Sequence, residues 1–133
     1  MSLQSLEPKT IWSHFENINA VPRASKKEEA IIAYMLQFGE SLSLPTSRDE
    51  AGNVLICKPA SAGYESRKTV VLQAHLDMVH QKNADSDFDF EKSGIEMYVD
   101  ADWVKAKGTT LGADNGLGVA TIMAVLASDD IDH

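Results

Sequence analysis

The sequence has 133 residues, 44% hydrophobic and 24% charged, which is sufficient for one domain with a packed core. Lys and Arg number 12 against 20 Asp and Glu, and the net charge of -8 disfavours nucleic acid and anionic membranes as partners. Cys57 is the only cysteine, which excludes an internal disulfide and a cysteine-based zinc knuckle, so any metal must be bound by His and carboxylate side chains.

The sequence carries no recognisable signal for a membrane or for secretion. No stretch approaches about 18 uninterrupted apolar residues. Residues 1–9 lack the basic start and apolar run of a signal peptide. We therefore expect a cytoplasmic protein.

The first part of the chain predicts two helices. Residues 10–20 carry apolar side chains at helical spacing, and Pro22 disfavours continuation of that helix. Residues 25–28, Ser-Lys-Lys-Glu, form a capping-box pattern, and an apolar helical face follows as far as Gly39. We expect a short first helix and a second helix that begins at the capping box.

Two short runs rich in β-branched residues then predict strands. Val54, Leu55 and Ile56 follow a turn-forming Ala-Gly-Asn sequence, and residues 69–74 read Thr-Val-Val-Leu-Gln-Ala between loop residues. The second run is the expected central strand. Helix pairs interleaved with strands indicate an α/β layer architecture.

Residues 78–102 form a polar, acidic excursion, which we interpret as a solvated surface segment with one hairpin within residues 95–104. Aromatic side chains elsewhere are expected in or near the core, with no cofactor role: Trp12, Phe15 and Trp103.

An Asp-x-Asp-x-Asp pattern in the excursion imitates part of a calcium loop. It begins at Asp85, and Glu96 follows eleven residues later. Phe90 occupies the position where such a loop needs glycine, and no helices flank the segment, so calcium binding is disfavoured.

His75, Leu76 and Asp77 directly follow the expected central strand. In an extended chain, residues i and i+2 project from the same face about 6.6 Å apart, so His75 and Asp77 should point the same way while Leu76 faces the core. Alone, the triplet favours an ordinary strand-end histidine paired with its neighbour. Its position is typical of a functional site, because sites collect at strand ends in α/β sheets. His80 has the opposite parity and should be exposed.

A glycine-rich segment, residues 108–118, leads into an apolar helix expected over residues 116–127. Its four glycines indicate unusual backbone dihedrals or very close approach to another group. Asp114 lies where loop and helix meet, and the simplest interpretation of Asp114 alone is a helix N-cap. The segment lacks the Gly-Lys-Ser/Thr ending of a phosphate loop and the third glycine of a dinucleotide fingerprint.

Taken together, the two segments resemble the di-zinc exopeptidases, a family that includes glutamate carboxypeptidase and succinyl-diaminopimelate desuccinylase. The resemblance rests on His-Leu-Asp-Met-Val after an apolar strand and on Gly-Thr-Thr-Leu-Gly-Ala-Asp-Asn-Gly before an apolar helix. The 39-residue separation of His75 and Asp114 is similar to that of the bacterial aminoacyl-histidine dipeptidases, which are carnosinase-like Xaa-His dipeptidases. Similarity extends over essentially the whole chain, including residues 21–25 and 49–53.

The resemblance implies a role for three side chains. His75 looks like a terminal ligand of one zinc ion, and Asp114 like the carboxylate that bridges both zinc ions. Asp77 is similar to the catalytic-site acid that holds the His75 imidazole in its metal-binding tautomer. A cis peptide bond between Asp114 and Asn115 is also implied.

The implied activity is metal-dependent hydrolysis of Xaa-His dipeptides and related short peptides. Two zinc ions, with manganese or cobalt as alternatives, would polarise the scissile carbonyl and supply a hydroxide-like nucleophile. The intact enzyme would be a homodimer formed through an inserted lid domain. The implied fold is the N-terminal part of the three-layer α/β catalytic domain of a zinc exopeptidase, without the lid, and residues 1–133 form that truncated portion.

The family's other functional parts are a Glu-Glu pair, a further acidic ligand and a distant histidine, and none is expected within residues 1–133. Glu28 and Glu29 are no substitute, because they lie in the expected capping box. We therefore expect activity in the parent enzyme and an inert fragment that binds metal weakly through His75 and Asp114. Alternatives are an aminotripeptidase, a carboxypeptidase, an N-acyl deacylase, or a non-catalytic metal-binding module on the same scaffold.

Overall fold

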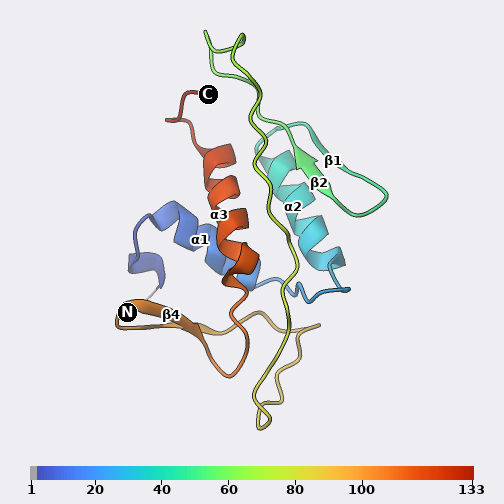
Figure 1. Ribbon diagram of the computed structural model, residues 1–133, viewed down its shortest axis with the longest axis vertical. Helices are drawn as coiled ribbons and strands as arrows, with labels where there is room; N and C mark the ends of the chain where they lie inside the picture. The colour runs from blue at the N-terminus through green and yellow to red at the C-terminus, as the bar shows by residue number, and fades with distance from the viewer. Residues whose placement is uncertain (1–2) are drawn as a thin grey trace.

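The computed structural model describes residues 3–133 and combines helices with two small β-hairpins (Figure 1). Within that range no helix is long and apolar enough to cross a membrane. The elements in chain order are a 3-10 turn at Leu3–Ser5, α1 (Lys9–Asn19), α2 (Glu29–Ser41), β1 (Thr46–Arg48), β2 (Val54–Ile56), β3 (Met97–Asp100), β4 (Trp103–Ala106) and α3 (Ala113–Ala127).

The hydrophobic core lies mainly where α3 packs against α1 (Figure 1). Phe15 of α1 and Met123 of α3 are fully buried, as the helical spacing of their apolar neighbours predicts. Gly116 lets the two helices approach closely, because a Cβ there would lie 2.9 Å from a ring carbon of Phe15. Ile31 and Met35 of α2 complete the same core. The three expected helices are thus confirmed.

The capping box expected at the start of α2 is absent. Glu28 occupies the N-cap position without a side-chain cap, and its carboxylate accepts a hydrogen bond from the Lys26 backbone N–H at 2.7 Å. The Ser25 hydroxyl donates instead to the Asp77 carboxylate and to the Met78 carbonyl. A contact with a distant segment has therefore replaced the local cap.

Gly39 lies inside α2, which continues to Ser41, and does not end the helix as expected. A Cβ at this position would lie 2.1 Å from the Thr46 hydroxyl oxygen. The glycine allows β1 to pack closely on the helix.

The strands form two separate two-stranded antiparallel sheets. In one, Thr46 pairs with Ile56 and Arg48 with Val54, which confirms the first predicted strand. In the other, β3 and β4 pair from Met97 with Ala106 to Asp100 with Trp103, which confirms the expected hairpin, two residues later than the predicted residues 95–104.

The expected central strand at residues 69–74 is not formed. The segment is an extended tube in Figure 1 that carries no strand assignment. A β-strand needs a neighbour with which to exchange backbone hydrogen bonds, and no described segment pairs with this one. Its apolar side chains are exposed accordingly, Val70 by 78% and Val71 by 80%.

The expectation that Trp103 lies in or near the core is also wrong, since this residue is 69% exposed. Side chains alternate along β4, and Trp103 shares the exposed face with Lys105 while Val104 points inward. The other two aromatic predictions are confirmed, because Phe15 is fully buried and Trp12 packs at the edge of the core.

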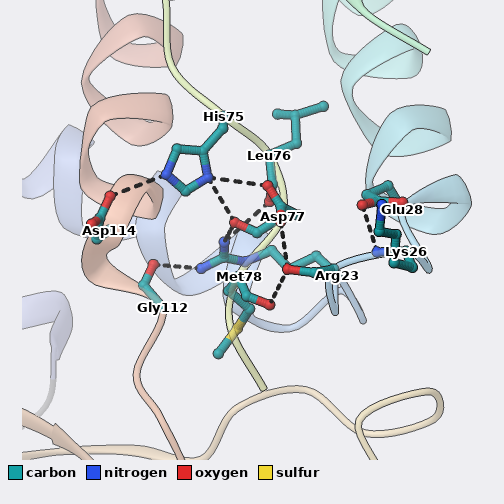
Figure 2. Close-up of polar contacts among 10 residues, drawn as sticks. Arg23, Lys26, Glu28, His75, Leu76, Asp77, Met78, Gly112 and Asp114 are labelled. Atoms are coloured by element: carbon teal, nitrogen blue, oxygen red, sulfur yellow. Dashed lines mark hydrogen bonds and ion pairs between the residues drawn. The ribbon is translucent and has the colours of Figure 1, made fainter. Parts of the chain in front are cut away.

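The chain leaves the body of the molecule before the acidic excursion and re-enters it after the β3–β4 hairpin at nearly one place. The Thr110 N–H donates to the Gln81 carbonyl at 2.9 Å, and the Asn83 N–H donates to the Gly108 carbonyl at 2.8 Å. These bonds close the base of the excursion. As a result, the segment before it, which carries His75, lies beside the segment after it, which carries Asp114 (Figure 2).

Candidate metal centre

His75 and Asp114 face each other although 39 residues separate them (Figure 2). The Nε2 atom of His75 lies 3.1 Å from Oδ1 of Asp114. His75 comes from the end of the extended segment, and Asp114 comes from the first residues of α3. The side chains are 48% and 96% exposed, so this pair of donor atoms is open to solvent.

The second ring nitrogen of His75 is directed at Asp77, as expected. Nδ1 lies 3.0 Å from the backbone carbonyl oxygen of Asp77 and 3.2 Å from Oδ1 of its carboxylate. Leu76 between them packs against the core, also as expected. Both partners of Nδ1 are acceptors, which favours a proton on Nδ1, while Nε2 faces the Asp114 carboxylate and can either donate a proton to it or, once that proton is lost, offer its lone pair to a cation.

Asp77 is itself held by a hydroxyl. The Ser25 Oγ donates to Oδ2 of Asp77 at 2.5 Å, and this hydrogen bond, followed by the charge of His75, lowers the pKa of Asp77. Hydrogen bonding to Asp114, reinforced by Asp77, raises the pKa of His75. The imidazole therefore lies in a negative environment that favours a bound proton or another cation.

Asp114 is not the N-cap of α3. Gly112 occupies the cap with a left-handed φ of 73°, and Asp114 has non-helical dihedrals that turn its carboxylate toward His75. The peptide bond between Asp114 and Asn115 is cis, which confirms the expectation. The Asn115 side chain folds back to accept a hydrogen bond from the Gly118 N–H at 3.1 Å, and a Cβ at residue 118 would lie 2.1 Å from its oxygen.

The donor atoms fit a zinc-type ion. Imidazole nitrogen and carboxylate oxygen are common zinc ligands, and two ligands of a tetrahedral zinc at about 2.0–2.1 Å lie about 3.3 Å apart. The separation of 3.1 Å between His75 Nε2 and Asp114 Oδ1 is close to that value. Residues 3–133 contain no group of three or more His, Cys, Asp or Glu side chains that could hold a metal. This part of the chain thus brings two of the side chains named by the resemblance, His75 and Asp114, within 3.1 Å of each other, and the calcium-like pattern forms no group of three either.

Other sequence candidates lie apart from this pair. His80 is exposed and packs edge-on against the Phe90 ring at 5.6 Å. Glu29, at the start of α2, is paired with Arg48 at 2.7 Å.

The sequence interpretation missed two residues that build the site, Arg23 and Ser25. Both lie in the 21–25 segment that shares the family resemblance, but no local pattern marks either as functional. The contacts that place them at the site, with Leu76 and Asp77, reach more than 50 residues along the sequence.

Comparison with known proteins finds no matching family model. The chain is 50% identical over 131 residues to the cytosol non-specific dipeptidase of Escherichia coli strain K12, covering 98% of this chain and 27% of that protein. It superposes on the crystal structure of aminoacylhistidine dipeptidase from Vibrio alginolyticus with a TM-score of 0.97 and 49% identity, over all of this chain and 27% of that one. A tripeptidase from Staphylococcus aureus shares the fold, with a TM-score of 0.66 and 19% identity over 89% of this chain and 31% of the other.

These matches confirm the expected α/β class, since the structure corresponds to part of peptidase structures that mix helices and strands. The chain spans about a quarter of the length of the two similar dipeptidases. Over that span, and over nearly its own whole length, this chain is homologous to cytosol non-specific dipeptidase and aminoacylhistidine dipeptidase.

Proposed function

We propose that this chain supplies part of the metal centre of a cytoplasmic dipeptidase that hydrolyses Xaa-His dipeptides and related short peptides. The observation that carries the proposal is the convergence of His75 Nε2 and Asp114 Oδ1 at 3.1 Å in a chain homologous to dipeptidases. The net charge of -8 supports a small substrate over nucleic acid or an anionic membrane. The proposal includes residues 1–133 as the N-terminal portion of the catalytic domain, and dimerisation through a lid domain outside them.

His75 and Asp114 are the residues that would hold zinc, or manganese or cobalt in its place. When bound, a pair of such ions supplies Lewis-acid polarisation of the scissile carbonyl and a water activated near neutral pH. The task of Asp77 is to keep the proton of His75 on Nδ1, so that the lone pair of Nε2 would be available to the metal. Ser25 keeps Asp77 turned toward the imidazole by donating to its other oxygen.

The 133-residue chain alone is expected to bind metal weakly and to lack turnover. It brings together two donor side chains within its described part, whereas a catalytic zinc site ordinarily has three protein ligands and a water. Calorimetric titration with zinc tests this expectation, and nanomolar affinity that survives His75→Ala would contradict it.

The activity is tested on protein expressed from the complete reading frame. We expect it to hydrolyse dipeptides with a C-terminal histidine, to lose turnover on treatment with a chelator, and to regain it with zinc. His75→Ala should abolish turnover, whereas His80→Ala, a matched change of an exposed histidine outside the site, should not. Hydrolysis that survives both chelation and His75→Ala would overturn the proposal.

The same assay separates the substrate alternatives. A panel of dipeptides, tripeptides and N-acyl amino acids shows which class is turned over fastest. Preference for tripeptides or N-acyl amino acids would reassign the substrate and leave the metal centre in place. Metal binding without hydrolysis of any panel member would instead indicate a non-catalytic metal-binding module.

A further inference from the structure

Arg23 is a charged residue buried in the interior of the protein, where charged side chains are rare. It lies in the chain between α1 and α2, and only 2% of its surface is exposed. Burial lowers its pKa to about 10, and the nearby Asp77 carboxylate opposes that shift. Its guanidinium therefore remains a cation at neutral pH.

The guanidinium touches both backbone segments that carry the proposed metal ligands (Figure 2). Nη1 donates to the carbonyl of Leu76 at 3.1 Å, between His75 and Asp77 in sequence. Nη2 donates at 2.7 Å to the carbonyl of Gly112, two residues before Asp114. One rigid planar group thus joins the two segments.

The glycine-rich segment is shaped to receive this group. A Cβ at Gly112 would lie 2.4 Å from Nη2 of Arg23, and a Cβ at Gly116 would lie 2.7 Å from the same atom. No side chain fits at either position without displacing the guanidinium. Arg23 is therefore one reason why Gly112 and Gly116 have no side chain, beside the positive φ of Gly112 and the contact of Gly116 with Phe15.

A buried amide ties the arrangement to α1. The Asn19 side chain, which has no exposed surface, accepts a hydrogen bond from Nη2 of Arg23 at 2.6 Å. Its own amide N–H donates to the Leu111 carbonyl at 3.1 Å. Arg23 and Asn19 together fix the glycine-rich segment against a helix of the core.

We propose that Arg23 is a positioning residue, whose planar guanidinium sets the separation of His75 and Asp114 and so the geometry of the metal centre. This inference rests on the proposed function. Lysine cannot replace arginine here, because a single ammonium nitrogen cannot reach carbonyls on two segments with the fixed fork of a guanidinium.

The test uses Arg23→Lys in protein expressed from the complete reading frame, with Arg48→Lys as the matched control. Arg48 is an arginine that pairs with Glu29 away from the site. We expect Arg23→Lys to lower zinc affinity about tenfold or more in competition titrations, the usual size of an effect transmitted through residues that support ligands. The visible absorption spectrum of the cobalt-substituted protein should also change, because it reports ligand geometry. Arg48→Lys should match the unmodified protein in both measurements.

A folded Arg23→Lys protein with unchanged zinc affinity and cobalt spectrum would overturn the positioning role of Arg23 but leave the proposed function in place. If the unmodified protein bound neither zinc nor cobalt, the proposed function would fall, and this inference with it.

If Arg23→Lys does not fold, Asn19→Asp decides the question. The new carboxylate can still accept from Arg23, but the donor to Leu111 is lost, so the same cobalt spectral change is expected in smaller degree. An unaltered spectrum in folded Asn19→Asp protein would overturn the positioning role.

Discussion

Both ring nitrogens of His75 face a carboxylate oxygen, and the two carboxylates differ in their surroundings. Asp77 is 33% exposed and accepts the Ser25 hydroxyl, so its orientation is fixed. Asp114 is 96% exposed, and its carboxylate has His75 as its side-chain partner. The fixed carboxylate is suited to orienting the imidazole, and the open one is suited to binding a metal.

We predict that Asp77→Asn lowers metal affinity or turnover of the complete enzyme about 10- to 100-fold, because the amide preserves shape but removes the charge behind the imidazole. Thermal stability should change little, and restoration by excess zinc would show that affinity is affected. Asp85→Asn, in the acidic excursion, is the matched control. If Asp77→Asn has no effect while His75→Ala abolishes binding and turnover, the tautomer-holding role is wrong.

His14 is a residue whose burial predicts pH-dependent stability. Its Nδ1 is buried with no partner among the described residues, its ring packs edge-on against Phe38, and burial lowers its pKa. The pKa of His14 in the folded state therefore lies below its unfolded value of 6.5. The stability contributed by the neutral imidazole is fully present above pH 6.5 and is lost as the pH falls through the folded-state pKa.

We predict that His14→Phe reduces the drop in melting temperature between about pH 7.5 and pH 5, since a phenyl ring at this partly buried position cannot be protonated. The matched control is His80→Phe, which changes an exposed histidine. Identical pH profiles for His14→Phe and the unmodified protein would show that His14 does not contribute.

At the scale of elements, helices were predictable where side-chain periodicity alone decides the structure. The apolar spacing in α1 and α3 is a local property, and it correctly identified Phe15 as a core residue. The strand expected at residues 69–74 failed because a strand also needs a partner, which a single segment cannot reveal. The capping box failed for a similar reason, since the tertiary contact of Ser25 with Asp77 replaced the local one.

The α1–α3 contact predicts a large cost for truncating its buried side chains. Met123→Ala should lower the free energy of unfolding by about 2–5 kcal/mol, because Met123 is fully buried and leaves a cavity. Trp103→Ala removes a larger side chain that is 69% exposed, and its effect should stay within about 0.5 kcal/mol. Urea unfolding compares the two, and a larger effect for Trp103→Ala would contradict the packing described.

At the scale of the whole molecule, the motifs predicted the proposed ligands but not what brings them together. His75, Asp77 and Asp114 were named by the family resemblance of their two segments taken together, and the structure places the three side chains in one cluster. Arg23 and Ser25 were missed because their function depends on residues distant in sequence. Nothing in the local sequence marks either residue, and only the fold brings the 21–25 segment beside Leu76 and Asp77.

The unpaired run at residues 69–74 predicts self-association of the 133-residue chain. Val70, Val71 and Leu72 are exposed on a segment without strand pairing, and such segments tend to pair with other chains. Val71→Lys should reduce concentration-dependent association measured by sedimentation. Val79→Lys, at another exposed valine outside the run, should reduce it less. Equal effects of the two changes would exclude the run as the interface.

Because two backbone hydrogen bonds join the ends of the segment that contains the acidic excursion, the length of that segment does not affect the geometry of the site. Thr110 returns to Gln81, and Gly108 to Asn83, so the backbone re-enters the molecule beside the point where it left. The number of residues between these pairs therefore does not set the distance from His75 to Asp114. An insertion or deletion among these intervening residues would therefore leave the separation of the His75 and Asp114 side chains unchanged.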